Sequence, residues 1–135
     1  MYSKSVNQNL QGLKVLVAED NKINSFVLQK FLNIWNVEVQ FAVTGLEALQ
    51  FVQEDDFDVI LMDLQMPELD GQQATTAIRA LEDKKVNRIP IVALTADASV
   101  STQELLLHNG FNHFITKPFN PDALYRILKK YYNVN

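Results

Sequence analysis

Short apolar runs alternate with amphipathic stretches five times along this chain. The runs are Lys14–Ala18, Val37–Phe41, Val59–Met62, Ile91–Leu94 and His113–Thr116. The first, third and fourth runs are almost continuously apolar, which is typical of strands buried on both faces, whereas the second alternates like an edge strand. The pattern predicts an α/β fold: a doubly wound, five-stranded parallel sheet with helices on both faces.

The stretches between these runs carry apolar residues at helical spacing. The first stretch has its periodic positions at Ile23, Phe26, Val27, Lys30, Phe31 and Ile34. The later stretches have theirs at Leu46, Leu49 and Val52, at Ala74, Ile78 and Leu81, and at Leu124, Ile127 and Leu128. We therefore expect amphipathic helices over these stretches.

Several residues have the chemistry of helix ends. Ser101 and Glu104 have the spacing of a capping box, and Asn120–Asp122 places a cap before a proline at the first helical position. Asn36 and Gly110 stand where a helix ends, and both residue types tolerate a positive φ. These signals set the expected limits of three helices.

The first twelve residues, 1–12, are polar and aperiodic, so we expect a leader or linker there and a single domain over 13–135. A chain of this length buries enough surface for a stable core without disulfides or a structural metal. The sequence contains no cysteine, which excludes disulfides, thiol nucleophiles and zinc–thiolate sites, and fits a reducing cytosol.

The net charge and the hydropathy narrow the function classes further. Twelve basic and sixteen acidic residues give a formal charge of −4, which argues against a broad nucleic-acid-binding face. No apolar run approaches the roughly eighteen residues of a membrane span, and the N-terminus is too polar for a signal peptide. We expect a soluble, cytoplasmic domain without membrane contact.

Polar side chains follow the predicted strands at the edge where ligands bind in open parallel sheets. Glu19 and Asp20 follow the first run, Asp63 ends the third, Thr95 follows the fourth, and Lys117 follows the fifth. Each carboxylate alone could cap a helix or lie in solvent, and Lys117 could form an ion pair with Asp63 without any further role. Three adjacent carboxylates repel one another unless a cation is present, so together they favour a Mg²⁺ site.

No glycine-rich phosphate-binding loop follows any of the strands, and the whole chain has four glycines. Nucleotide binding through such a loop is therefore disfavoured.

At this point the chain resembles the receiver domains of two-component response regulators. The resemblance covers Lys14 to about Tyr131 and depends on four motifs in the family's order and spacing. These motifs are Ala18-Glu-Asp-Asn21, Asp63-Leu-Gln-Met-Pro-Glu-Leu-Asp-Gly71, Ala93-Leu-Thr-Ala96 and Lys117-Pro-Phe119. The resemblance implies a flavodoxin-like sheet of order 2-1-3-4-5.

The resemblance also implies roles for single residues. Asp63 is expected to accept a phosphoryl group from a phosphohistidine and form an acyl phosphate. Glu19, Asp20, Asp63 and the backbone carbonyl of Gln65 are expected to bind Mg²⁺. Such a domain assists its own phosphorylation and dephosphorylation and is not an enzyme in the ordinary sense.

Thr95 and Lys117 are expected to bind the phosphoryl oxygens, because phosphoryl transfer needs positioning and charge neutralisation. Phe114 occupies the place of the family's aromatic switch residue, whose movement would accompany that of Thr95. It lacks the hydroxyl of a tyrosine, and the alternative is a simple core aromatic.

Within the family, Glu19–Asn24 and Ile89–Ala96 look most like the receivers of hybrid sensor histidine kinases, although a stand-alone receiver could carry the same residues. The implied partner is a histidine kinase domain or a histidine phosphotransfer protein. A haloacid-dehalogenase-type phosphatase is the main rival, but it generally has a second aspartate where this chain has Gln65. A degenerate receiver that binds partners without phosphorylation is the other alternative.

Overall fold

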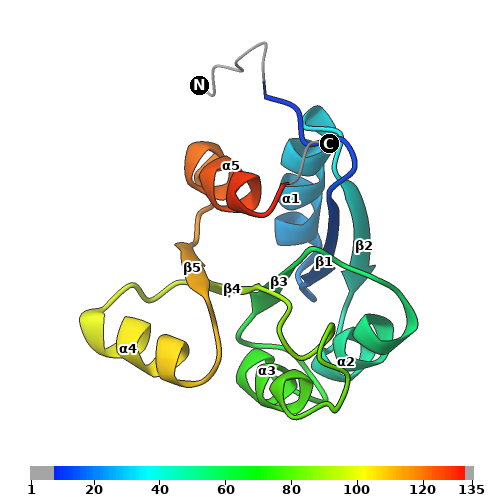
Figure 1. Cartoon of the computed structure of the whole chain (residues 1–135). Coiled ribbons are helices and arrows are strands. Elements are labelled where there is room, and N and C mark those ends of the chain that lie inside the picture. The colour runs from blue at the N-terminus through cyan, green and yellow to red at the C-terminus, as the bar shows by residue number, and fades with distance from the viewer. Residues whose placement is uncertain (1–7, 133–135) are drawn as a thin grey trace.

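The computed structural model describes residues 8–132 and shows five strands and five helices in strict alternation (Figure 1). The elements are β1 (Lys14–Ala18), α1 (Lys22–Ile34), β2 (Glu38–Ala42), α2 (Gly45–Glu54), β3 (Val59–Asp63), α3 (Gly71–Arg79), β4 (Ile91–Thr95), α4 (Val100–His108), β5 (His113–Thr116) and α5 (Pro121–Lys130). Within this part of the chain, none of the helices has both the length and the hydrophobicity of a membrane-spanning segment.

The five strands form one parallel sheet of order β2-β1-β3-β4-β5. This confirms the predicted fold class and the strand order that the family resemblance implied. The first, third, fourth and fifth strands begin where the sequence predicts. β2 begins at Glu38, one residue later than expected, and it is an edge strand as its alternation indicates.

Helices cover both faces of the sheet (Figure 1). On one face, α1 and α5 pack on the sheet through Leu28, Leu32, Trp35, Leu124 and Leu128. On the other face, α2, α3 and α4 pack through Ala48, Val52, Ala74, Ile78 and Leu106. The helices cover the two faces of the sheet. A ligand site can therefore form at the carboxyl edge, where the strands end.

The first stretch forms helix α1 as its spacing predicts, but only part of its apolar residues face the sheet. Leu28 and Leu32 are its buried residues, whereas Ile23 is 74% exposed and Phe26 is 63% exposed. The helix carries apolar residues on more than one face, and spacing alone does not say which of them meets the sheet. The structure therefore leaves an exposed apolar pair at the N-terminal end of α1.

Three of the helix-end predictions are confirmed and one is wrong. Asn36 and Gly110 have positive φ values of 60° and 101°, and Asn120 caps α5 ahead of a proline. The predicted capping box of Ser101 and Glu104 does not form. Instead α4 begins earlier: Ser99 is its N-cap and accepts a hydrogen bond from the Thr102 amide.

The segment before β1 contributes to the core. Leu10 is fully buried, and its amide donates a hydrogen bond of 2.7 Å to the Trp35 carbonyl. The Tyr132 hydroxyl donates to the Gln11 carbonyl at 2.8 Å. Although the sequence places Leu10 in the polar leader, this residue packs with the domain. Residues 1–7 of the expected leader lie outside the described residues.

Arg79 connects the end of α3 to two loops at the amino edge of the sheet. Its guanidinium donates to the carbonyls of Asn87, Ile89 and Gly110 and to Asn112 Oδ1, at distances of 2.7–3.0 Å. All of these acceptors are uncharged, and burial lowers the pKa of Arg79. The arginine thus connects α3 with the segments that lead into β4 and β5.

Candidate functional site

The structure brings the predicted polar residues together at the carboxyl edge of the sheet. Glu19 follows β1, Asp63 ends β3 and Thr95 ends β4, and all three are nearly buried, at 1%, 5% and 6% exposure. Asp20 is exposed beside them. Carboxylate oxygens of Glu19, Asp20 and Asp63 lie within 4.8 Å of one another, as convergence of strand ends predicts.

Glu19 has the most unusual environment in this cluster. Burial, followed by the neighbouring Asp63 carboxylate, raises its pKa to about 7, although the Asn21 amide and Lys117 act in the opposite direction. Its Oε2 accepts a hydrogen bond from the Asn21 amide at 3.1 Å, but no group within residues 8–132 donates one to its Oε1. A buried carboxylate oxygen without a donor is suited to a cation.

Lys117, which directly follows β5, provides the positive charge of the site. Its Nζ lies 3.1 Å from Asp63 Oδ1 and 3.4 Å from Glu19 Oε1. Its amide donates to the Thr95 carbonyl at 2.8 Å, which continues the pairing of β5 with β4. The same residue therefore connects the strand end to two of the carboxylates.

The loop after β3 is shaped by close backbone packing. The Gln65 amide donates to Asp63 Oδ1 at 3.3 Å, and the Gly71 amide donates to the Leu64 carbonyl at 3.0 Å. A Cβ atom on Gly71 would lie 2.1 Å from the Asp63 carbonyl oxygen, so only glycine fits there. Asp70 then caps α3 in a capping box with Gln73. This packing fixes the backbone on both sides of Asp63.

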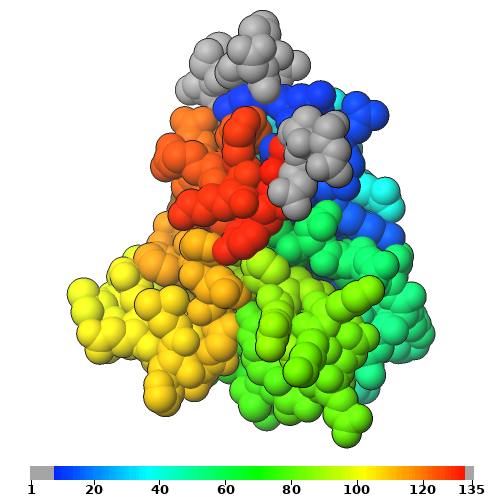
Figure 2. Space-filling view, viewed as in Figure 1, coloured from blue at the N-terminus to red at the C-terminus, as the bar shows by residue number. Residues whose placement is uncertain are grey.

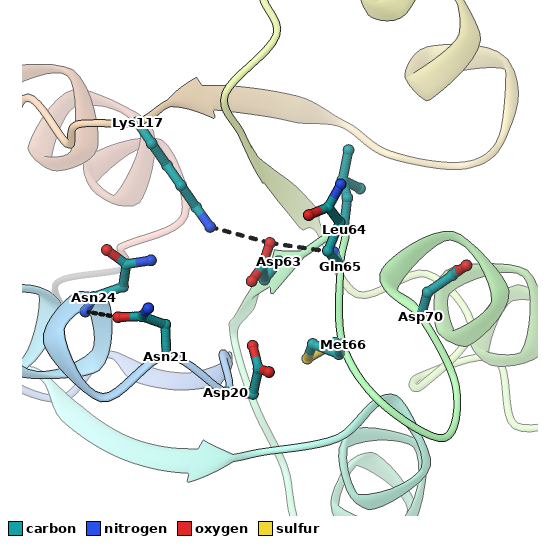
Figure 3. A pocket seen from close by; sticks show the side chains of 9 residues that line it. All are labelled: Asp20, Asn21, Asn24, Asp63, Leu64, Gln65, Met66, Asp70 and Lys117. Atoms are coloured by element: carbon teal, nitrogen blue, oxygen red, sulfur yellow. Dashed lines mark hydrogen bonds and ion pairs between the residues drawn. The ribbon is translucent and has the colours of Figure 1, made fainter.

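A hollow of about 540 Å³ opens beside the acidic cluster, and Figure 3 shows Lys117 pointing across it toward Asp63. Its lining consists of Asp20, Asn21, Asn24, Asp63, Leu64, Gln65, Met66, Asp70 and Lys117. Asn21 and Asn24 were not among the predicted site residues. Their signal in the sequence was that Asn21 directly follows the acidic pair and that Asn24 comes three residues later, in the first turn of α1.

Thr95 lines a second, smaller hollow of about 160 Å³ together with Asp63, Gln65, Asp97 and Lys117. Gln65 borders both hollows. Phe114 lies farther along, on the edge strand β5. It is partly buried against the cluster that α2, α3 and α4 cover, and is paired in register with Ala93 of β4.

The donor set fits a hard divalent cation. Three carboxylates lie together, one of them buried with an oxygen that lacks a hydrogen-bond donor among residues 8–132, and the single charge of Lys117 does not neutralise all three. Oxygen ligands with few carboxylates and room for water are the preferred surroundings of Mg²⁺. Such an ion would neutralise the carboxylates and leave coordination positions open toward the hollow.

Comparison with known proteins identifies relatives across most of the chain. The family model named response regulator receiver domain matches residues 15–129. Hybrid signal transduction histidine kinase I of Dictyostelium discoideum is 41% identical over 120 residues, which are 85% of this chain and 7% of that protein. The sensor protein GacS of Pseudomonas syringae pv. syringae is 40% identical over 87% of this chain and 13% of its own length. The chain thus spans a small part of these relatives.

Two solved structures are also similar. One is the receiver domain of the sensor histidine kinase PA1611 from Pseudomonas aeruginosa, with a magnesium ion coordinated in its active-site cleft; it has a TM-score of 0.80 and 38% identity over 89% of this chain and 97% of its own. The other is the receiver domain of Ssk1 in complex with the histidine phosphotransfer protein Ypd1, both from Saccharomyces cerevisiae. It has a TM-score of 0.83 and 33% identity over 91% of this chain and 90% of that one.

Proposed function

Because this chain belongs to the family of response regulator receiver domains, we propose that Asp63 is the residue that accepts its phosphoryl group. A receiver is a phosphoacceptor in two-component signalling, and the family match favours this function over the dehalogenase-type phosphatase. The observation that carries the assignment is the position of Asp63 at the end of β3, 3.1 Å from Lys117 Nζ and within the acidic cluster.

In the reaction, a carboxylate oxygen of Asp63 forms a bond to the phosphorus of a phosphohistidine. The phosphorus–nitrogen bond breaks, and the imidazole leaves with the electron pair of that bond. Lys117 neutralises negative charge beside the attacking carboxylate, and Thr95 donates a hydrogen bond to a phosphoryl oxygen. The protein contributes mainly position and charge neutralisation, which this kind of transfer requires.

Magnesium is the cofactor. Glu19, Asp20, Asp63 and the backbone carbonyl of Gln65 are the proposed ligands, supported by the mutual distances of the three carboxylates. When bound, the ion neutralises charge on the carboxylates and on the phosphoryl oxygens. The raised pKa of Glu19 and its Oε1 without a donor support its participation.

The phosphorylated domain signals through a change of shape or passes the phosphoryl group on. Movement of Thr95 toward the phosphoryl group and of Phe114 on β5 is the proposed route to the face of α4, β5 and α5. Hydrolysis of the acyl phosphate, assisted by the same site, returns the domain to its resting state. We place the domain in the cytoplasm, within a hybrid histidine kinase. Residues 13–135 are the proposed receiver and residues 1–12 the proposed linker, whose end packs on the domain through Leu10.

The phosphodonor is a histidine kinase domain or a histidine phosphotransfer protein. Asn21 and Asn24, at the N-terminal end of α1, line the hollow, and the exposed Ile23 and Phe26 lie on the same helix end. Exposed apolar residues beside a reaction site mark a protein-docking surface. The partner would therefore cover this end of α1 while its phosphohistidine reaches Asp63.

Incubation with acetyl phosphate and Mg²⁺ tests the assignment of Asp63. Intact mass should increase by one phosphoryl group in the wild type and in Asp56→Asn, which changes an exposed aspartate away from the site. The increase should be absent in Asp63→Asn. An adduct that persists in Asp63→Asn would place the acceptor on another residue, and an unmodified wild type would support the degenerate receiver.

A further inference from the structure

The Thr95 hydroxyl is held by the backbone of the residue two positions ahead. Its Oγ1 accepts a hydrogen bond from the Asp97 amide at 3.0 Å and donates to the Asp97 carbonyl at 3.3 Å. A hydroxyl has one proton. Thr95 therefore has to give up the Asp97 carbonyl before it can donate to a phosphoryl oxygen on Asp63.

The carboxylate of Asp97 is hydrogen-bonded to residues at the start of α4. These contacts hold Asp97 in place. Its Oδ1 accepts from the Ser99 amide at 2.8 Å, and its Oδ2 accepts from the Thr102 hydroxyl at 2.7 Å. These hydrogen bonds, that of Thr102 first, lower the pKa of Asp97, so the carboxylate is ionised at neutral pH. Asp97 thus contacts the Thr95 hydroxyl with its backbone and the start of α4 with its carboxylate.

The surroundings of α4 allow its first turn to respond. Leu106 is the buried residue of this helix, whereas Val100, Leu105 and Leu107 are 69%, 49% and 59% exposed. Figures 1 and 2 show α4, in yellow, at the periphery of the molecule. Its C-terminal end is fixed, because Arg79 donates two hydrogen bonds to the Gly110 carbonyl just beyond it.

We propose that Asp97 is a positioning residue for Thr95: its carboxylate, bonded to Thr102 at the start of α4, holds the Asp97 backbone where it retains the Thr95 hydroxyl. The hydrogen bond between Asp97 and Thr102 thereby stabilises the resting conformer. Phosphorylation draws Thr95 away, and the loss of that contact reaches α4 through the same residue. This inference depends on the proposed phosphorylation of Asp63 and adds to it a specific connection to α4.

Thr102→Val tests the contact between Asp97 and α4 without changing a residue of the phosphorylation site. The substitution removes the hydroxyl of Thr102 and keeps a branched side chain. The amide shifts of Thr95, Asp97 and α4 are recorded with Mg²⁺ alone and with added beryllofluoride, a phosphoryl mimic. In Thr102→Val without the mimic, the population of the active conformer should rise about tenfold, as expected for the loss of one hydrogen bond to a carboxylate. Thr102→Ser, which restores the hydroxyl, should return the shifts to the wild-type positions.

Two further variants separate this connection from a general effect on helices. Thr76→Val makes the same change on an exposed position of α3 and should leave the shifts unchanged. The double variant Asp97→Ala/Thr102→Val should shift no further than Asp97→Ala alone, because Asp97→Ala already removes the hydrogen bond to Thr102 together with the one from the Ser99 amide. Additive shifts in the double variant would overturn the proposal.

The proposal is also wrong if Thr102→Val keeps the wild-type shifts without the mimic. Failure of the phosphoacceptor assignment has a different signature. In that case beryllofluoride would move no amide near Asp63 in the wild type, whatever the variants show.

Discussion

The ammonium nitrogen of Lys117 lies 3.1 Å from Asp63 Oδ1, and the two residues come from the ends of different strands of the sheet. At this distance the lysine faces the oxygen atoms among which the phosphoryl group would be placed. It is therefore both a partner of the resting carboxylate and a charge available to the transfer. Its removal should affect chemistry more than folding, since its side chain is partly exposed.

Lys117→Gln should slow phosphorylation of Asp63 by acetyl phosphate by about 100-fold, the usual effect of removing one preorganised charge from a reaction site. The rate is followed by intact mass against time at saturating Mg²⁺. Lys84→Gln, at an exposed loop position, is the matched control and should react at the wild-type rate. If Lys117→Gln reacts at the same rate as the control, Lys117 forms an ion pair with Asp63 but has no role in the transfer.

Glu19 should make the stability of the metal-free protein depend on pH. Its pKa is about 7 in the folded state against an ordinary value of 4.5, so between these values the folded state binds more protons than the unfolded state. Stability is then highest below the ordinary pKa and falls as pH rises through the folded pKa. The free energy of unfolding in EDTA should fall by about 1–3 kcal/mol between about pH 5 and pH 8.

Urea unfolding at several pH values checks this expectation. Glu19→Gln should remove most of the fall, and saturating Mg²⁺ should stabilise the wild type more at the upper end of the range, where Glu19 is ionised. A pH dependence that is unchanged in Glu19→Gln would assign the titration to another group.

Phe26→Ser should weaken transfer from a protein donor but not from a small one. The phenyl ring is 63% exposed, on the helix end that borders the hollow, and the fold does not depend on it. With a phosphorylated histidine phosphotransfer protein as donor, transfer should fall by about tenfold or more, because aromatic residues that become buried in protein interfaces dominate their binding energy. With acetyl phosphate it should be unchanged. Leu107→Ser, on α4, is the control and should leave both rates at the wild-type value.

Arg79→Met should cost stability without touching the site. The change leaves the part-buried carbonyls of Ile89 and Gly110 without the guanidinium donor, and the expected loss is about 2–4 kcal/mol in the free energy of unfolding. Chemical denaturation measures it, with the exposed Arg88→Met as reference. Phosphorylation of Asp63 by acetyl phosphate should persist in the folded fraction. Equal stability of the two variants would show that water replaces the guanidinium.

The sequence by itself determined the alternation of strands and helices and the residues that follow each strand. Apolar runs and helical spacing are local signals, and the ends of parallel strands meet at one edge whatever the helices do. For that reason Glu19, Asp63 and Lys117 could be predicted to converge. Their roles in phosphoryl transfer came from the family resemblance and are still predictions.

The tertiary structure alone decided what depends on contacts between distant segments. It buries Leu28 and exposes Phe26, although Phe26 is one of the periodic positions and Leu28 is not, because Leu28 packs against the sheet. It places Leu10 in the core because Trp35 accepts its backbone hydrogen bond. It also makes Ser99 the N-cap of α4, where the Asp97 carboxylate accepts a hydrogen bond from the Ser99 amide. The spacing of residues along the chain does not predict these three features. Each depends on which surfaces and hydrogen-bond donors the folded chain brings together.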